Sequence, residues 1–262
     1  MNADAAFHFP FETFRSAAGF RHFLHTNRAL LDQRYAYETA CAAATQEPVL
    51  MTPGSCGLCL RATSFTTQMP ERLSEAADRA APGNDVLEPN WREQQLCGCP
   101  DRLNCRFRAM LHYIEAEIDP PPWTRLLLLG AAQSIETRLL RMAAQVAVRA
   151  RSGRLLRAPR FEAQAYHLIL SCEHLHAEQA MDAVLAGLRD ALMPGGHLVF
   201  TAPFDTASDV SIAPGPGRTG VLGWDILPRL ARAGFSAAAA HLFWSEEFGY
   251  LGPFNLIFSA AA

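Results

Sequence analysis

The segment YHLILSCEHLHAEQAMDAVLAGLRDALMPGGHLVFTAPF, residues 166–204, decides the fold. Its first seven residues, 166–172, form a nearly continuous apolar run, which is typical of a strand buried on both faces. Residues 176–192 then carry apolar side chains at helical spacing, and a Pro-Gly-Gly turn leads into a second strand over 193–204. Because parallel strands are joined through a crossover helix, this segment predicts a β-α-β unit.

The same alternation continues on both sides of this unit. Strands are predicted at 125–130 and 145–150, and helices at 134–145 and 224–235. Ser134 is the expected N-cap of the first helix and Gly234 the C-terminal glycine of the second. The runs AAAAHLFWS and NLIFSAAA predict a final antiparallel hairpin. Alternating strands and helices predict an α/β fold with a mainly parallel sheet covered on both faces.

The N-terminal part has a different pattern. One long helix or two shorter helices are expected over 11–46, and a hairpin carrying a Cys-x-x-Cys turn over 48–67. A loop is expected over 68–90 and a further helix over 102–118, which Asp119 and three prolines end. We therefore expect a helical and cysteine-knuckle module over 1–121 and an α/β domain over 122–262.

The α/β half resembles the class I S-adenosylmethionine-dependent methyltransferases. The segment quoted above resembles the fourth strand, the following helix and the fifth strand of that family. The blocks GWDILPRLARAGF and FWSEEFGYLGPFNLIFSA are similar to the C-terminal end of a bacterial subgroup that often carries a cysteine knuckle and an Asn-Trp-Arg-Glu stretch. Here these stand at 56–59 and 90–93. The resemblance covers about 50–262 and implies a Rossmann-like methyltransferase sheet.

The resemblance also implies a cofactor site. The cofactor's methionine end is expected near the turn after the first strand, and its adenosine near the end of the fourth; the implied residues are Gly130, Ala131, Ala132, Ser171, Cys172 and Glu173. Only Gly130 remains of the family's usual glycine-rich turn, and no acid stands between Glu136 and Glu162 to bind the ribose. The span from 130 to 167 is short, which predicts a sheet with a trimmed edge.

Five cysteines fall within fifty residues: Cys56, Cys59, Cys97, Cys99 and Cys105. Tetrahedral zinc takes four soft ligands, commonly from Cys-x-x-Cys knuckles. We expect a structural zinc on Cys56, Cys59, Cys97 and either Cys99 or Cys105. Free buried cysteines, or a redox or catalytic cysteine, are the alternatives, and Cys41 and Cys172 are expected in the core.

Three side chains near strand ends are candidate catalytic groups. His174 and His176 follow the 166–172 strand, and histidine serves as a general base near neutral pH. The alternative for both is helix capping and surface exposure. Asp205 follows the 193–204 strand and is the third candidate. Seven arginines between 138 and 160 either bind an anion or are simply solvated.

Composition excludes several classes of function. The net charge of −3 gives no electrostatic case for nucleic acid binding, and no apolar run is long enough for a membrane span. All 23 basic residues are Arg, which excludes a Lys nucleophile. The start lacks a signal-peptide pattern, so a cytoplasmic location is expected.

Two functions from different classes remain. The first is a methyltransferase acting on a small molecule or a carrier-bound intermediate. The second is a catalytically silent subunit of the same fold that binds or scaffolds a protein partner. A protein partner or a homodimer is compatible with either.

Overall fold

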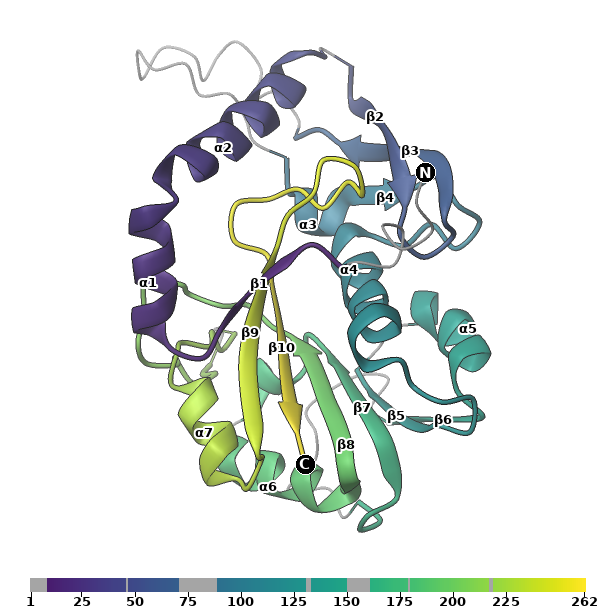
Figure 1. The fold of residues 1–262 in the computed structure, drawn as a ribbon, viewed down its shortest axis with the longest axis vertical. Helices are drawn as coiled ribbons and strands as arrows, with labels where there is room; N and C mark the ends of the chain where they lie inside the picture. Colours follow the sequence, from purple (N-terminus) through teal and green to yellow (C-terminus); the bar gives the residue numbers. More distant parts are fainter. Residues whose placement is uncertain are drawn as a thin grey trace.

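The computed structural model describes residues 9–45, 47–70, 89–130, 133–149, 161–178, 180–216 and 219–262. Seven strands form the main sheet in the order β1-β9-β10-β8-β7-β5-β6 (Figure 1). They are β1 (Phe11–Phe14), β5 (Arg125–Leu129), β6 (Gln145–Arg149), β7 (Tyr166–Cys172), β8 (Leu192–Thr201), β9 (Ala237–Phe243) and β10 (Leu256–Ala261). A second sheet, in the order β2-β3-β4, consists of β2 (Val49–Cys56), β3 (Arg61–Gln68) and β4 (Gln95–Cys97).

Helices connect and cover these strands. In chain order they are α1 (Ala17–Thr26), α2 (Arg28–Ala43), α3 (Trp91–Gln94), α4 (Cys105–Tyr113), the π-helical turn η2 (Ile114–Ile118), α5 (Gln133–Met142), the 3₁₀ turn η3 (Leu175–Ala177), α6 (Met181–Ala191) and α7 (Ile226–Arg232). None of the helices in the described ranges combines the length and the hydropathy needed to cross a lipid bilayer.

The predicted α/β fold is confirmed. Strands β6, β5, β7 and β8 are parallel neighbours, and β10 runs antiparallel to both β8 and β9, which is the expected terminal hairpin. Among the described residues no strand lies beyond β6, as the trimmed edge predicted.

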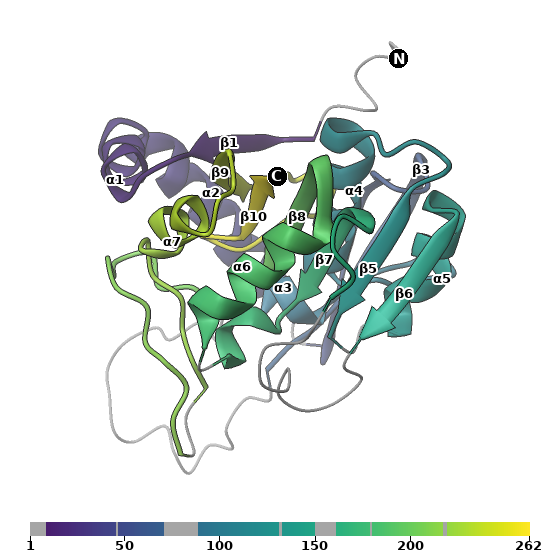
Figure 2. The same ribbon diagram turned by 90° about the horizontal axis from the view of Figure 1, so that it is seen from below.

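The two faces of the sheet are covered by different helices (Figures 1 and 2). Leu127 and Leu129 of β5 belong to one buried cluster, together with apolar residues of α6 and α7. Leu126 and Leu128 belong to the other cluster, together with residues of α4 and α5. All four leucines are at most 1% exposed, because successive residues of a central strand point to opposite, equally covered faces.

Two predicted boundaries were wrong. Residues 11–14 were expected in a helix but form β1, which pairs antiparallel with β9 and covers an otherwise open edge of the sheet. The helix expected from 176 begins only at Met181, because Glu178 takes an extended conformation that ends the short turn η3.

Two further boundaries also differ from the prediction. The Pro-Gly-Gly residues lie inside β8, at a register shift against β7, where a missing proline N–H is tolerated. Helix α5 already includes Gln133, so Ser134 is inside the helix rather than at its N-cap.

The expected hairpin over 48–67 is confirmed as β2 and β3, and the helix over 102–118 as α4 and η2. Residues 71–88 of the expected loop lie outside the described ranges. The fully buried Arg108 of α4 donates hydrogen bonds to the carbonyls of Phe248 and Gly249 and to Gln95 Oε1. This arginine ties the small sheet to the loop between β9 and β10.

Candidate functional site

The switch point of the main sheet lies between β5 and β7. From β5 the chain goes outward to β6, returns past β5 and continues through β7 and β8, so the crossovers change direction at this pair. Open parallel sheets bind ligands outside the carboxyl ends of the strands at such a point. Gly130 follows β5 here, and Ser171 and Cys172 end β7. The structure therefore brings these predicted residues to one place.

Gly130 makes the turn from β5 toward α5 with a φ of +99°, which residues with a side chain rarely adopt. A Cβ atom at this position would lie 2.8 Å from the carbonyl oxygen of Cys172. Glycine is thus required here for two reasons, its conformation and the close approach of the two strand ends. Ala131 and Ala132, the other residues expected at this turn, lie outside the described residues.

Glu173, directly after β7, is held by charges from the N-terminal half. Its backbone adopts a positive φ of 52°, and its N–H donates to the carbonyl of Thr201 at the end of β8. Its carboxylate pairs with the guanidinium of Arg92 and lies 3.6 Å from that of Arg106. The carboxylate expected beside the adenosine is therefore engaged by two arginines.

These arginines belong to a wider network. Glu93 accepts two hydrogen bonds from Arg106, at 2.8 and 2.9 Å, in the bidentate geometry that arginine and carboxylate favour. Arg106 also donates to Thr201 Oγ1 at 3.3 Å, and its side chain is 9% exposed. The network joins α3 and α4 to the carboxyl ends of β7 and β8. The Asn-Trp-Arg-Glu motif pointed to Arg92 and Glu93, but no sequence signal distinguished Arg106 or Thr201.

The end of β7 and the segment after it contain buried polar atoms without hydrogen-bond partners. They are Ser171 Oγ, His174 Nε2 and His176 Nδ1, and their residues are 0%, 9% and 8% exposed. His174 Nε2 lies 3.6 Å from Glu178 Oε1, which is beyond hydrogen-bonding distance. Burial lowers the pKa of both histidines, so both imidazoles are neutral at pH 7. Neither caps α6, which begins five residues after His176.

Asp205 is placed differently from the prediction. Its carboxylate accepts a hydrogen bond from the N–H of Ala207, and the residue is exposed at a surface turn. This is the local arrangement that Asp commonly adopts in turns, and it gives Asp205 a structural role.

The arginine-rich stretch is described only in part. Arg138 donates to Glu115 Oε1 and to the carbonyl of Leu58, and so fastens α5 to the cysteine hairpin. The arginines at 151, 154, 157 and 160 lie outside the described residues.

Three of the five clustered cysteines come together, with Cys59 beside them. The Sγ atoms of Cys56, Cys97 and Cys99 lie within 4.8 Å of one another, and the thiol of Cys59 interacts with those of Cys56 and Cys99. Cys105 is not part of this group, because its fully buried Sγ faces the carbonyl oxygen of Leu251 at 3.9 Å. Of the two alternatives for a fourth ligand, the structure places Cys99 in the cluster and Cys105 outside it.

Comparisons with known proteins assign no family to the chain. No family model and no curated protein matches it. Similar solved structures include an S-adenosylmethionine-dependent methyltransferase from Mesorhizobium loti, with 16% identity, a TM-score of 0.41, and coverage of 60% of this chain and 98% of that one. The 1,6-didemethyltoxoflavin-N1-methyltransferase of Burkholderia thailandensis has 16% identity, a TM-score of 0.40, and coverage of 60% and 77%. The [4+2]-cyclase SpnF has 15% identity, a TM-score of 0.38, and coverage of 55% and 64%.

Proposed function

We propose that this chain binds S-adenosylmethionine at the switch point and transfers its methyl group to a small molecule or a carrier-bound intermediate. One observation carries the proposal. Three buried polar atoms without partners, on Ser171, His174 and His176, are gathered within six residues at the carboxyl end of β7. Leaving such an atom unpaired costs about 1–3 kcal/mol. Their concentration at the ligand-binding end of a parallel sheet supports a ligand that supplies the missing partners.

The residues at this end suit the cofactor. Gly130, with Ala131 and Ala132 after it, would hold the methionine end, because a turn without a Cβ lets the backbone approach a ligand. Ser171, Cys172 and Glu173 would hold the adenosine. When bound, the cofactor supplies a methyl group already activated on a sulfonium.

The chain's own contribution would be positioning and exclusion of water, which supply much of the rate enhancement in such transfers. The imidazoles of His174 and His176 are neutral. A neutral imidazole can accept the proton that an O–H or N–H group loses when it receives the methyl group.

We expect binding of the cofactor to be weak. Between Glu136 and Glu162 the chain has no Asp or Glu to accept hydrogen bonds from the ribose hydroxyls. A lost charge-assisted hydrogen bond costs about 1.5–3 kcal/mol, or roughly tenfold to a hundredfold in affinity.

We further propose a structural zinc ion on Cys56, Cys59, Cys97 and Cys99. Three thiols within 4.8 Å of one another, with Cys59 beside them, offer the sulfur ligands that zinc prefers, and two of the four, Cys56 and Cys97, are buried. In the described region Cys97 and Cys99 Sγ lie 2.8 Å apart, closer than the roughly 3.8 Å that tetrahedral bonds of about 2.3 Å would set. Binding would therefore separate these two thiols. The ion would hold the β2–β3 turn against β4, and β4 directly follows α3 with its Arg92.

A second candidate function is favoured by the Glu173 contacts. Arg92 and Arg106, from the chain's own N-terminal half, already engage the carboxylate that would face the adenosine. This arrangement suits a catalytically silent subunit that binds a protein partner.

Equilibrium dialysis of the full chain against labelled S-adenosylmethionine separates the two candidates. If the chain is a methyltransferase, the cofactor is retained and Glu173→Gln, which removes the charge but not the shape, lowers retention. If it is a silent subunit, neither protein retains the cofactor at millimolar concentration.

A further inference from the structure

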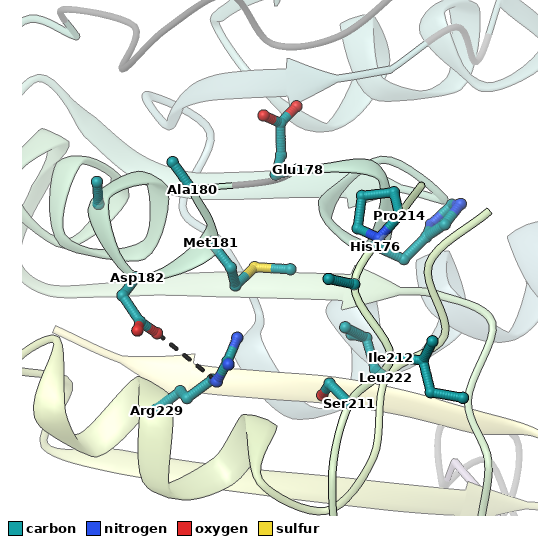
Figure 3. A pocket seen from close by; sticks show the side chains of 12 residues that line it. His176, Glu178, Ala180, Met181, Asp182, Ser211, Ile212, Pro214, Leu222 and Arg229 are labelled. Atoms are coloured by element: carbon teal, nitrogen blue, oxygen red, sulfur yellow. Dashed lines mark ion pairs between the residues drawn. The ribbon is translucent and has the colours of Figure 1, made fainter. Parts of the chain in front are cut away.

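A cavity of about 200 Å³ lies beside the switch point, between η3, the start of α6, residues 211–214 and α7 (Figure 3). Its outer wall is a built loop. Ile212 and Val221 form an antiparallel bridge, and Leu222 bridges to Phe204. A Cβ at Gly220 would lie 2.0 Å from the carbonyl oxygen of His176, so glycine lets this loop close tightly over η3. The cavity therefore has a fixed wall on each side.

The first turn of α6 opens onto this cavity. Ala180, Met181, Asp182 and Ala183 all line it, and the N-cap Ala180 offers no side chain to the first-turn N–H groups. The helix has eleven residues. Uncapped N–H groups at the start of such a helix carry partial positive charge and favour an anionic or strongly accepting ligand group.

His176 is a second polar element of this cavity. Its side chain belongs to the cavity wall, only 8% of the residue is exposed, and Nδ1 has no hydrogen-bond partner (Figure 3). His176 and the uncapped helix start are thus two polar elements of the same cavity wall.

Arg229 of α7 completes the polar side of the cavity. Its Nε lies 3.1 Å from Asp225 Oδ2 and 3.7 Å from Asp182 Oδ1, and within the described ranges its two terminal nitrogens donate no hydrogen bond. In Figure 3 the guanidinium extends from α7 toward Met181 and Asp182. The terminal nitrogens form the edge that matches a carboxylate.

The nearby acids do not fill this position. One carboxylate oxygen of Asp225 already accepts hydrogen bonds from the N–H and the hydroxyl of Ser211. The side chain of Asp182 is 70% exposed and thus screened by water. The carboxylate of Glu178 points away from the cavity in Figure 3 and lies 3.6 Å from His174 Nε2.

We propose that this cavity binds a small organic carboxylate of about one ring in size. Its oxygens lie on the first-turn N–H groups of α6 and on the terminal nitrogens of Arg229. Its apolar part packs against Met181, Ile212 and Leu222. The volume supports this size, since a cavity of about 150 Å³ holds benzene. If this carboxylate is also the methyl acceptor, that role rests on the proposed function. The binding of the carboxylate to this cavity does not rest on it.

The test is calorimetric titration of the full chain, without cofactor, using benzoate as the probe and the uncharged isostere benzamide as its match. We expect a Kd of about 1 mM for benzoate and binding of benzamide weaker by about tenfold. Arg229→Gln weakens benzoate about tenfold, and Arg229→Lys, which keeps the charge but not the fork, has an intermediate effect. Arg232→Gln, exposed on the same helix, leaves binding unchanged.

Ile212→Ala is a second variant, which tests the site even if the Arg229 variants do not fold. Ile212 is 43% exposed at the rim, so its truncation leaves the fold intact and weakens benzoate. Equal binding of benzoate and benzamide, binding of inorganic phosphate alone, or unchanged affinity in both Arg229→Gln and Ile212→Ala would overturn the proposal. Failure of the cofactor to bind while benzoate binds would refute only the proposed function, and the reverse result would refute only this site.

Discussion

The guanidinium of Arg92 is paired with the carboxylate of Glu173, which links the cysteine-bearing half of the chain to the switch point of the main sheet. Both side chains are less than a quarter exposed. Arg92 stands five residues before Cys97, and Glu173 directly follows β7. The pair therefore connects the segment that leads to Cys97 with a residue of the proposed cofactor site.

We predict that breaking this pair destabilises the fold. Arg92→Gln or Glu173→Gln should each lower the free energy of unfolding by about 1–3 kcal/mol, because either change removes a partly buried ion pair and leaves Arg92 with only Glu93, or Glu173 with only Arg106. Denaturant unfolding of both single variants and the double variant measures this. The effects should be less than additive. As a control, Arg28→Gln breaks a pair whose side chains are 85% and 74% exposed and should have almost no effect.

The metal prediction separates a cysteine of the cluster from Cys105, which sequence reasoning left as an alternative fourth ligand. Cys56→Ser should abolish stoichiometric zinc, and Cys105→Ser should retain it, because only the first thiol lies in the cluster. Elemental analysis of the purified variants is the measurement. Zinc lost equally from both, or no zinc in the parent chain, would contradict the assignment. A chelator should lower the Tm of the parent chain and leave that of Cys56→Ser unchanged.

His241 should make the fold sensitive to acid. Burial lowers its pKa to about 4, and its ring contacts Thr13 Oγ1 through Nδ1 and both Tyr113 Oη and Ser259 Oγ through Nε2, with Arg15 adding a smaller effect. The unfolded chain, with a pKa near 6.5, takes up a proton first. The contribution of His241 to the free energy of unfolding is therefore fully present above pH 6.5. It is lost as the pH drops toward 4, by up to about 3 kcal/mol.

Unfolding measured from pH 7.5 to 4 tests this. His241→Asn should remove much of the decline, while His25→Asn, exposed on α1, should keep the parent's profile. If the His241 and His25 variants decline alike, the buried imidazole is not the cause.

Arg108 should be among the most costly residues to replace. It is 1% exposed, donates to three acceptors, and its guanidinium lies 4.2 Å from the ring centre of Phe65. Arg108→Ala should lower the free energy of unfolding by about 3 kcal/mol or more, since buried carbonyls lose their donors and a cavity forms. Arg61→Ala, exposed at the start of β3, is the matched control and should change stability by less than about 0.5 kcal/mol.

The sequence predicted the parallel strands well, because 125–129 and 166–172 are mostly apolar, as strands buried on both faces are. It could not predict β1, because FETF is too short for periodicity to separate strand from helix, and its position depends on pairing with β9 across more than two hundred residues. Cysteine spacing predicted the cluster but not its fourth member, because only the fold turns Cys105 toward Leu251.

The candidate site could also be predicted only in part, because some of its residues are distant in the sequence. Residues directly after strands were identified by their order along the chain. Arg106 lies on α4, many residues before β7, and Arg229 lies on α7, many residues after it. Their positions in the sequence do not indicate that they lie near the end of this strand.

The central claim is that the carboxyl end of β7 binds S-adenosylmethionine, and Ser171 tests it most directly. Gly130 is less informative, because a side chain there would meet Cys172 whether or not a ligand binds. Ser171 Oγ is buried without a partner, so Ser171→Ala should leave the Tm unchanged or raise it. Calorimetric titration with S-adenosylhomocysteine should then give weak binding to the parent chain, with a Kd of roughly 10 μM to 1 mM, and about tenfold weaker binding to Ser171→Ala. No binding to the parent chain at millimolar ligand, or equal affinity for the two proteins, would contradict the account.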